Sequence, residues 1–164
     1  MTHLLIIILS FLAQNKMVEY SNKATKNGMT VKWEHMDNRI YFEMEAPNNG
    51  WVTIGFNTSS ATKGSYLLMG NITDNKPNVV EYYTLSAGNY QPISILGGHP
   101  KVENIEGKEV NNKTTLRFSL PTNPASIYAK NLNKGSEYIM LIAYSQSDDF
   151  QHHSSMRTSI KIKL

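Results

Sequence analysis

Alternation of apolar and polar residues with a period of two is the feature of this sequence that most limits its fold. Residues 29–34 (MTVKWE), 40–44 (IYFEM) and 160–164 (IKIKL) place an apolar side chain at every second position. Successive side chains of a β-strand point to opposite faces, so this pattern is typical of strands with one buried and one solvated face. No long segment has the apolar period of about 3.6 residues that a helix needs. These segments therefore predict an all-β protein.

Further short apolar runs, separated by turn residues, extend this prediction. The other predicted strands are 51–56, 66–70, 79–85, 93–96, 114–120 and 138–144. Segment 138–144 (YIMLIAY) is almost continuously apolar, which predicts a central strand covered on both faces. Only residues 123–131, with Pro124 at a suitable first position, can form a short helical turn. Many short strands at this spacing predict an immunoglobulin-like β-sandwich of roughly 9–11 strands.

Length and composition exclude several classes of protein. The chain has 164 residues and no cysteine. This length suits one domain that buries enough surface to fold without disulfides. The lack of cysteine excludes zinc–thiolate sites, iron–sulfur clusters and cysteine nucleophiles. The formal net charge is only +3, and the basic residues are spread along the chain, so we expect no nucleic-acid partner.

The N-terminal residues have the pattern of an export signal. Residues 4–13 (LLIIILSFLA) form an apolar run, which is too short for a transmembrane span because a span needs about 20 apolar residues. The run is typical of the central region of a signal peptide, with Ala13 near the cleavage point, although residues 1–3 carry no Lys or Arg. We expect a signal peptide over 1–14 and a single domain over 15–164; the alternative is a buried first strand. Small exported eukaryotic domains are often rich in disulfides, so export of a chain without cysteine favours a bacterial protein. We expect it in the periplasm, at the cell surface or secreted.

Six segments, taken in their order along the chain, point to a known family. They are 29–33 (MTVKW), 40–47 (IYFEMEAP), 50–56 (GWVTIGF), 64–70 (GSYLLMG), 114–121 (TTLRFSLP) and 141–157 (LIAYSQSDDFQHHSSMR). In this order they resemble the DOMON domain, over roughly residues 29–164. The resemblance implies a β-sandwich that binds haem b or a sugar between its sheets.

The resemblance also implies a set of haem ligands. DOMON cytochromes hold haem b through one axial Met and one axial His. The His corresponds to His153, with His152 as an alternative one residue away. The Met usually comes from the loop before the 64–70 strand, but this loop reads SSATKG and contains none. Lys63 in the loop is a substitute, because a related haem subunit uses Lys beside Met, and Met69 lies nearby in the strand.

Two further residues belong to this implied site. Arg157 can pair its planar guanidinium group with a haem propionate or a sugar hydroxyl. Tyr66 stands where the family often has an acidic residue, and aromatic residues of this kind can line a haem slot or stack on a sugar ring.

Each candidate also has a structural interpretation. His152 and His153 can be a solvated pair in a polar loop, or they can bind a metal such as copper. Lys63 and Arg157 can be ordinary surface cations, and the aromatic residues can fill the core of a sandwich.

The sequence lacks the common enzyme motifs. It contains no Gly-x-Ser-x-Gly elbow, no phosphate-binding glycine-rich loop and no His-Glu-x-x-His motif. We therefore expect no catalysis by this chain alone. One hypothesis is an exported module that binds haem b and transfers electrons to an extracytoplasmic redox partner. The alternative is a haem-free module that binds carbohydrate or another small ligand, and a third is an adhesion domain without a ligand.

Overall fold

A computed structural model describes residues 18–164. The predicted signal peptide at 1–14 lies outside the described residues. The described chain forms eleven strands: β1 (Asn22–Lys26), β2 (Met29–Met36), β3 (Arg39–Ala46), β4 (Val52–Asn57), β5 (Tyr66–Thr73), β6 (Lys76–Ser86), β7 (Asn89–Pro92), β8 (Glu103–Glu109), β9 (Thr114–Pro121), β10 (Glu137–Tyr144) and β11 (Met156–Lys163). This part of the chain contains no helix, and therefore none that is long and apolar enough to cross a membrane.

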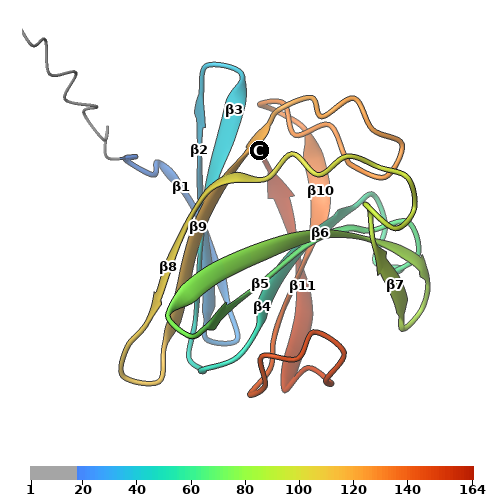
Figure 1. The fold of residues 1–164 in the computed structure, drawn as a ribbon. Coiled ribbons are helices and arrows are strands. Elements are labelled where there is room, and N and C mark those ends of the chain that lie inside the picture. Colours follow the sequence, from blue (N-terminus) through green and yellow to red (C-terminus); the bar gives the residue numbers. More distant parts are fainter. Residues whose placement is uncertain (1–17) are drawn as a thin grey trace, which may run out of the picture.

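The strands form two antiparallel sheets that pack face to face (Figure 1). Sheet A has five strands in the order β1-β2-β3-β9-β8, and sheet B has six in the order β11-β10-β4-β5-β6-β7. We call the side of each sheet that faces the other sheet its inner face. The predicted all-β sandwich is confirmed, and the number of described strands falls within the predicted range.

The alternating residues of the sequence make the core between the sheets. On β2 and β3, Val31 pairs with Met44 and Trp33 pairs with Phe42, and all four side chains are buried. The ring of Phe42 lies 5.6 Å from that of Phe56 on β4, which joins the two sheets. Burying a side chain of this size contributes about 1.5–3 kcal/mol. The buried side chains of the alternating segments therefore contribute most of the free energy that stabilises the fold.

Tight turns fix the register of neighbouring strands. Asn27 and Gly28 both have positive φ, at 49° and 82°, between the paired residues Lys26 and Met29. A two-residue type I′ hairpin requires this conformation at both central positions. Asp74 and Asn75, with φ of 53° and 59°, make the same kind of turn between β5 and β6 without a glycine.

Three predictions about individual elements are wrong. Residues 93–96 form a turn, in which Ile93 is buried and Ile95 is 73% exposed, because the chain leaves sheet B after Pro92. Residues 123–131 contain no helix, and Ala125 has a φ of 50°, which a right-handed helix does not allow.

The third correction concerns β10. This strand is second from the edge of sheet B, and only Met140 and Ile142 are fully buried in it. The strand covered on both faces is β4, in which all six residues are buried. Edge strands β1, β7 and β8 were missed because their mostly polar sequences have no clear alternation.

An ion-paired carboxylate ties three strands of sheet A together on its outer face. Glu43 on β3 accepts hydrogen bonds from Lys32 Nζ at 2.7 Å and Arg117 Nε at 2.6 Å, and its side chain is only 5% exposed. Burial alone raises the pKa of this carboxyl, but the hydrogen bonds and charges of Lys32 and Arg117 outweigh it and leave the pKa lowered. The ionised form is therefore the one that stabilises the fold.

We predict that Glu43→Gln lowers the free energy of unfolding at pH 7 by about 1.5–3 kcal/mol, the usual size of hydrogen bonds to a charged group. A carboxyl with a lowered folded pKa contributes stability above its ordinary pKa of 4.5 and loses it as pH falls through the folded value. Urea unfolding should thus give a difference in the free energy of unfolding between variant and wild type that is smaller at pH 3 than at pH 7. Glu45→Gln is the control, because its bridge to Lys113 is exposed; equal losses in both variants would contradict the assignment.

Candidate functional site

The outer face of sheet B carries a row of side chains across five strands. Strand pairing places Val80, Met69, Thr53, Ala143 and Arg157 side by side, on β6, β5, β4, β10 and β11 in that order. Their neighbours along each strand point inward to the core, so this row points outward. The row runs from an apolar end at Val80 and Met69 to a cationic end at Arg157, with two small residues between them.

A small apolar cluster covers the Met69 end of this row. Trp51, Met69 and Tyr82 are buried together, and Phe150 packs against them. The ring of Phe150 lies 6.0 Å from that of Tyr82, and Tyr82 lies 5.4 Å from Tyr90, both edge to face. Met69 is consequently only 2% exposed. We call these five residues the outer cluster.

The segment between β10 and β11, residues 145–155, closes over the outer cluster and is fixed by backbone contacts. Trp51 N donates to Ser147 O at 3.0 Å, and Ser145 N donates to Trp51 O at 2.9 Å. Asn71 Nδ2 donates to Asp148 O at 2.8 Å, and the hydroxyl of Tyr90 donates to Phe150 O. The β10–β11 loop is thereby held to β4, β5 and β7.

His152 and His153 lie in this loop, and both are exposed. His152 Nδ1 lies 3.0 Å from the carbonyl of His153 and 3.1 Å from Ser145 Oγ. Since a carbonyl oxygen only accepts, Nδ1 is the donor in that contact. Because both residues are exposed, their imidazoles are accessible to a ligand or metal.

The other predicted site residues lie elsewhere. Lys63 is exposed, and its carbonyl accepts a hydrogen bond from Asn57 Nδ2 at 3.0 Å, at the end of β4 opposite to Trp51. The two ends of β4 are about 17 Å apart at the usual rise of a strand. Tyr66 is fully buried on the inner face, where its hydroxyl donates to Glu81 Oε2 at 2.6 Å. Met69 and Arg157 thus share the outer face of sheet B, three strands apart, and the two histidines lie in the β10–β11 loop. Lys63 and Tyr66 lie away from this face.

Glu81 anchors the segment that follows β7. Besides the hydroxyl of Tyr66, two backbone N–H groups donate to Glu81: that of Lys101, and that of Val102 at 2.6 Å. Burial and the charge of Glu81 raise the pKa of Tyr66 well above its usual value, so the phenol remains a donor. Sequence analysis missed Glu81, because nothing in its strand distinguishes a buried acid from a solvated one.

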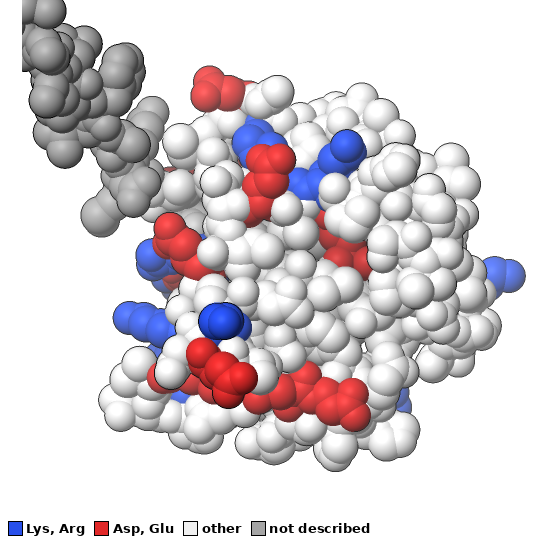
Figure 2. All heavy atoms as spheres, viewed as in Figure 1, with Lys and Arg blue, Asp and Glu red and all other residues white. Residues whose placement is uncertain are grey.

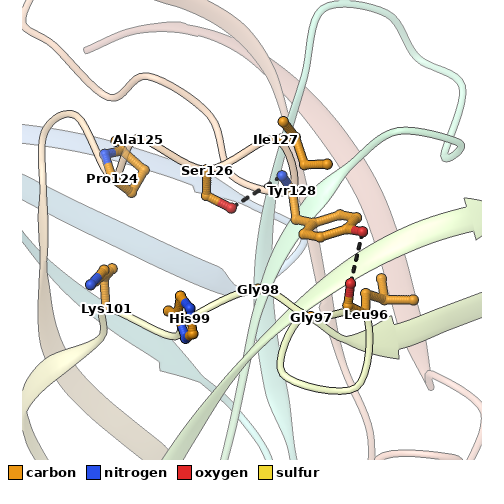
Figure 3. A pocket seen from close by; sticks show the side chains of 10 residues that line it. All are labelled: Leu96, Gly97, Gly98, His99, Lys101, Pro124, Ala125, Ser126, Ile127 and Tyr128. Carbon is orange, nitrogen blue, oxygen red and sulfur yellow. Dashed lines mark hydrogen bonds between the residues drawn. The ribbon is translucent and has the colours of Figure 1, made fainter.

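A hollow of about 440 Å³ lies between the segments after β7 and β9 (Figure 3). His99 and Lys101 stand on one side, with Ser126 and Tyr128 on the other. The hydroxyl of Tyr128 donates to Leu96 O at 2.8 Å, and this bond holds the two segments together. We call this feature the polar hollow.

Comparison with known proteins identifies the family. The model of the DOMON domain matches residues 25–145. This chain belongs to the DOMON domain family. No curated protein matches the sequence.

Two solved structures are similar to this DOMON domain. The cytochrome b domain of pyranose dehydrogenase from Coprinopsis cinerea has 10% sequence identity and a TM-score of 0.62, with 82% of this chain and 76% of that chain covered. The cytochrome domain of Myriococcum thermophilum cellobiose dehydrogenase has 9% identity and a TM-score of 0.54, with 83% and 74% covered. At these identities the likeness shows the fold alone.

The donor chemistry of the outer face of sheet B fits haem b. An imidazole and a thioether are known axial ligands of haem iron, and a guanidinium pairs well with a carboxylate. Met69 and Arg157 supply the thioether and the guanidinium on this face, and His153 supplies an exposed imidazole in the adjoining β10–β11 loop. Met69 is only 2% exposed, however, and Phe150 packs against its cluster, so a haem ligated by Met69 requires this cluster to open.

We predict that Phe150 controls access to Met69. In hydrogen peroxide, Met69 should be oxidised more slowly than the half-buried Met36, because Met69 is 2% exposed under Phe150. Phe150→Ala should speed oxidation of Met69 several-fold and leave Met36 unchanged, as measured by mass spectrometry of peptides. Unchanged oxidation of Met69 in a folded Phe150→Ala protein would show that Phe150 does not cover this residue.

Proposed function

We propose that this DOMON module binds haem b on the outer face of sheet B and transfers electrons. The observation that carries the proposal is the row that joins Met69 to Arg157, with two exposed histidines in the loop over the same face. A bound haem would supply reversible uptake of one electron. The similarity of the fold to two cytochrome domains favours haem over other small ligands.

Each residue has a distinct role in this proposal. His153 is the axial ligand from the loop, with His152 as the alternative, and Met69 is the axial ligand from β5. Arg157 pairs with a propionate at the edge of the face. Thr53 and Ala143 are the small side chains of the row between Met69 and Arg157. Thr53 is only 7% exposed, so a haem here also requires the groups that cover it to move. Lys63 is the alternative second ligand if the β4–β5 loop folds over the face.

Haem reconstitution tests these roles directly. We expect wild-type protein loaded with haem to give split α and β bands on reduction with dithionite, as a six-coordinate haem does. His153→Ala and Met69→Leu should each abolish this spectrum, because each removes one axial ligand. The matched controls are His99→Ala, in the polar hollow, and Met36→Leu, on sheet A; both should keep it.

The same experiment can reject the proposal. If the folded wild-type protein takes up no haem, the outer face is not a haem site. If His153→Ala and His99→Ala behave alike, His153 is not the ligand. If Met69→Leu alone keeps the spectrum, Lys63→Ala identifies whether the β4–β5 loop supplies the second ligand.

The proposal includes export and an extracytoplasmic redox partner. Cleavage after Ala13 or Gln14 would leave a domain that begins before β1. Intact-mass measurement of the exported protein tests this, and the mass of a chain that retains Met1 would contradict it. We infer no catalysis by the domain itself, so its partner would carry out the chemistry.

The polar hollow favours carbohydrate as a second candidate ligand. Its volume of about 440 Å³ suits a small molecule. Tyr128 offers an aromatic ring, while His99, Lys101 and Ser126 offer polar groups for sugar hydroxyls. Saturation-transfer NMR with a glycan panel tests it: Tyr128→Ala should abolish the transfer and Tyr90→Ala should not. No transfer from any glycan to the wild-type protein would remove this candidate.

A further inference from the structure

Buried oxygen atoms without donors gather at one end of the sandwich. Asn48 Oδ1, Asn71 Oδ1 and Asp148 Oδ1 are buried, and no hydrogen bond from the described residues reaches them. Asn48 is fully buried and Asn71 is 9% exposed. A buried amide or carboxylate oxygen without a donor loses its hydration and gains nothing in exchange, so native proteins seldom keep several together.

The two amides are fixed by the same loop. Asn71 Nδ2 donates to the carbonyl of Asp148 at 2.8 Å. Asn48 Nδ2 donates to the carbonyl of Ser145, three residues earlier. With their NH₂ groups held by loop carbonyls, neither side chain can turn its oxygen away without losing a hydrogen bond.

Glu109 adds a second carboxylate to this end. Thr114 Oγ1 lies 2.8 Å from Glu109 Oε1 and also 2.8 Å from the carbonyl of Asn48. A hydroxyl has one hydrogen, so it satisfies only one of these two acceptors while Glu109 is ionised. Acceptors therefore exceed donors around Asn48, Thr114 and Glu109.

No positive charge of the described chain compensates these acids. None of its salt bridges includes Glu109 or Asp148. Burial, together with the charge of Asp148, raises the pKa of Glu109, and burial raises that of Asp148. Figure 2 shows acidic side chains gathered along the lower edge, where Figure 1 places the β8–β9 turn and the β10–β11 loop.

We propose that Glu109, Asp148, Asn48 and Asn71 form a binding site for a calcium ion. Ca²⁺ takes six to eight oxygen ligands from carboxylates, amides and backbone carbonyls, in flexible geometry. Two carboxylates balance its charge, and the two amide oxygens give it neutral ligands. Mg²⁺ suits the site less because it needs near-ideal octahedral geometry and dehydrates reluctantly. With only two carboxylates, we expect a Kd of about 10⁻⁴–10⁻³ M, as in extracellular modules.

The site joins elements that are distant in sequence. It would tie the turn after β3 and the ends of β5 and β8 to the loop that carries Phe150 and both histidines. Calcium would then set how firmly this loop closes over the outer cluster. This inference does not depend on haem binding, because none of its four residues belongs to the proposed haem site.

Thermal unfolding of the haem-free full chain tests the site. We expect 5 mM CaCl₂ to raise the Tm of wild type by about 5 °C. Asp148→Asn and Glu109→Gln should lose most of this rise, because each removes one charged ligand at nearly constant shape. The neighbouring acids give matched controls: Asp149→Asn and Glu106→Gln, both exposed, should keep the full rise.

Luminescence of Tb³⁺ locates the ion independently. The backbone N and O of Trp51 bond to the same loop, so excitation of its indole should sensitise bound Tb³⁺, and CaCl₂ should displace the ion. Trp51→Phe should lose this emission, whereas Trp33→Phe should retain it. The proposal is overturned if wild type shows neither a rise in Tm with CaCl₂ nor Tb³⁺ emission that CaCl₂ removes. It is also overturned if Asp149→Asn loses as much of the Tm rise as Asp148→Asn does.

Discussion

The burial of β4 on both of its faces is the constraint on which the rest of this DOMON domain depends. Its inner face places Phe56 against Phe42 of the opposite sheet, and its outer face places Thr53 beside Met69. Its first end, through Trp51, holds the β10–β11 loop, and its last end, through Asn57, holds the loop that contains Lys63. One central strand therefore sets the core and the position of both loops proposed to serve a ligand.

The β10–β11 loop links the structural and functional parts of the account. Its Phe150 packs against the cluster that contains Met69, its two histidines are exposed, and its Asp148 lies at the acidic end of the sandwich. Uptake of haem needs Phe150 to leave, whereas calcium would hold the same loop closed, so the two proposed ligands act on one element.

Much of the fold follows from the sequence, because period-two alternation determines which side chains enter the core. This alternation correctly predicts the inner faces of β2 and β3. The family resemblance places Tyr66 and Met69 in one site, but the structure puts them on opposite faces of sheet B. Alternation does not reveal β8, whose polar residues pair at an edge, or the turn at 93–96, which has the composition of a strand. The oxygen cluster is beyond sequence reasoning, since Asn48, Asn71, Glu109 and Asp148 meet only after both sheets have formed.

The central claim is that a planar ligand binds over the outer face of sheet B. Nuclear magnetic resonance of isotope-labelled protein with ferric haem tests it most directly, because the iron broadens or shifts amide signals close to it. We expect the amide signals of Met69, Ala143 and His153 to change and those of His99 and Tyr128 in the polar hollow to stay the same. Changes confined to the polar hollow, or none at all, would contradict it.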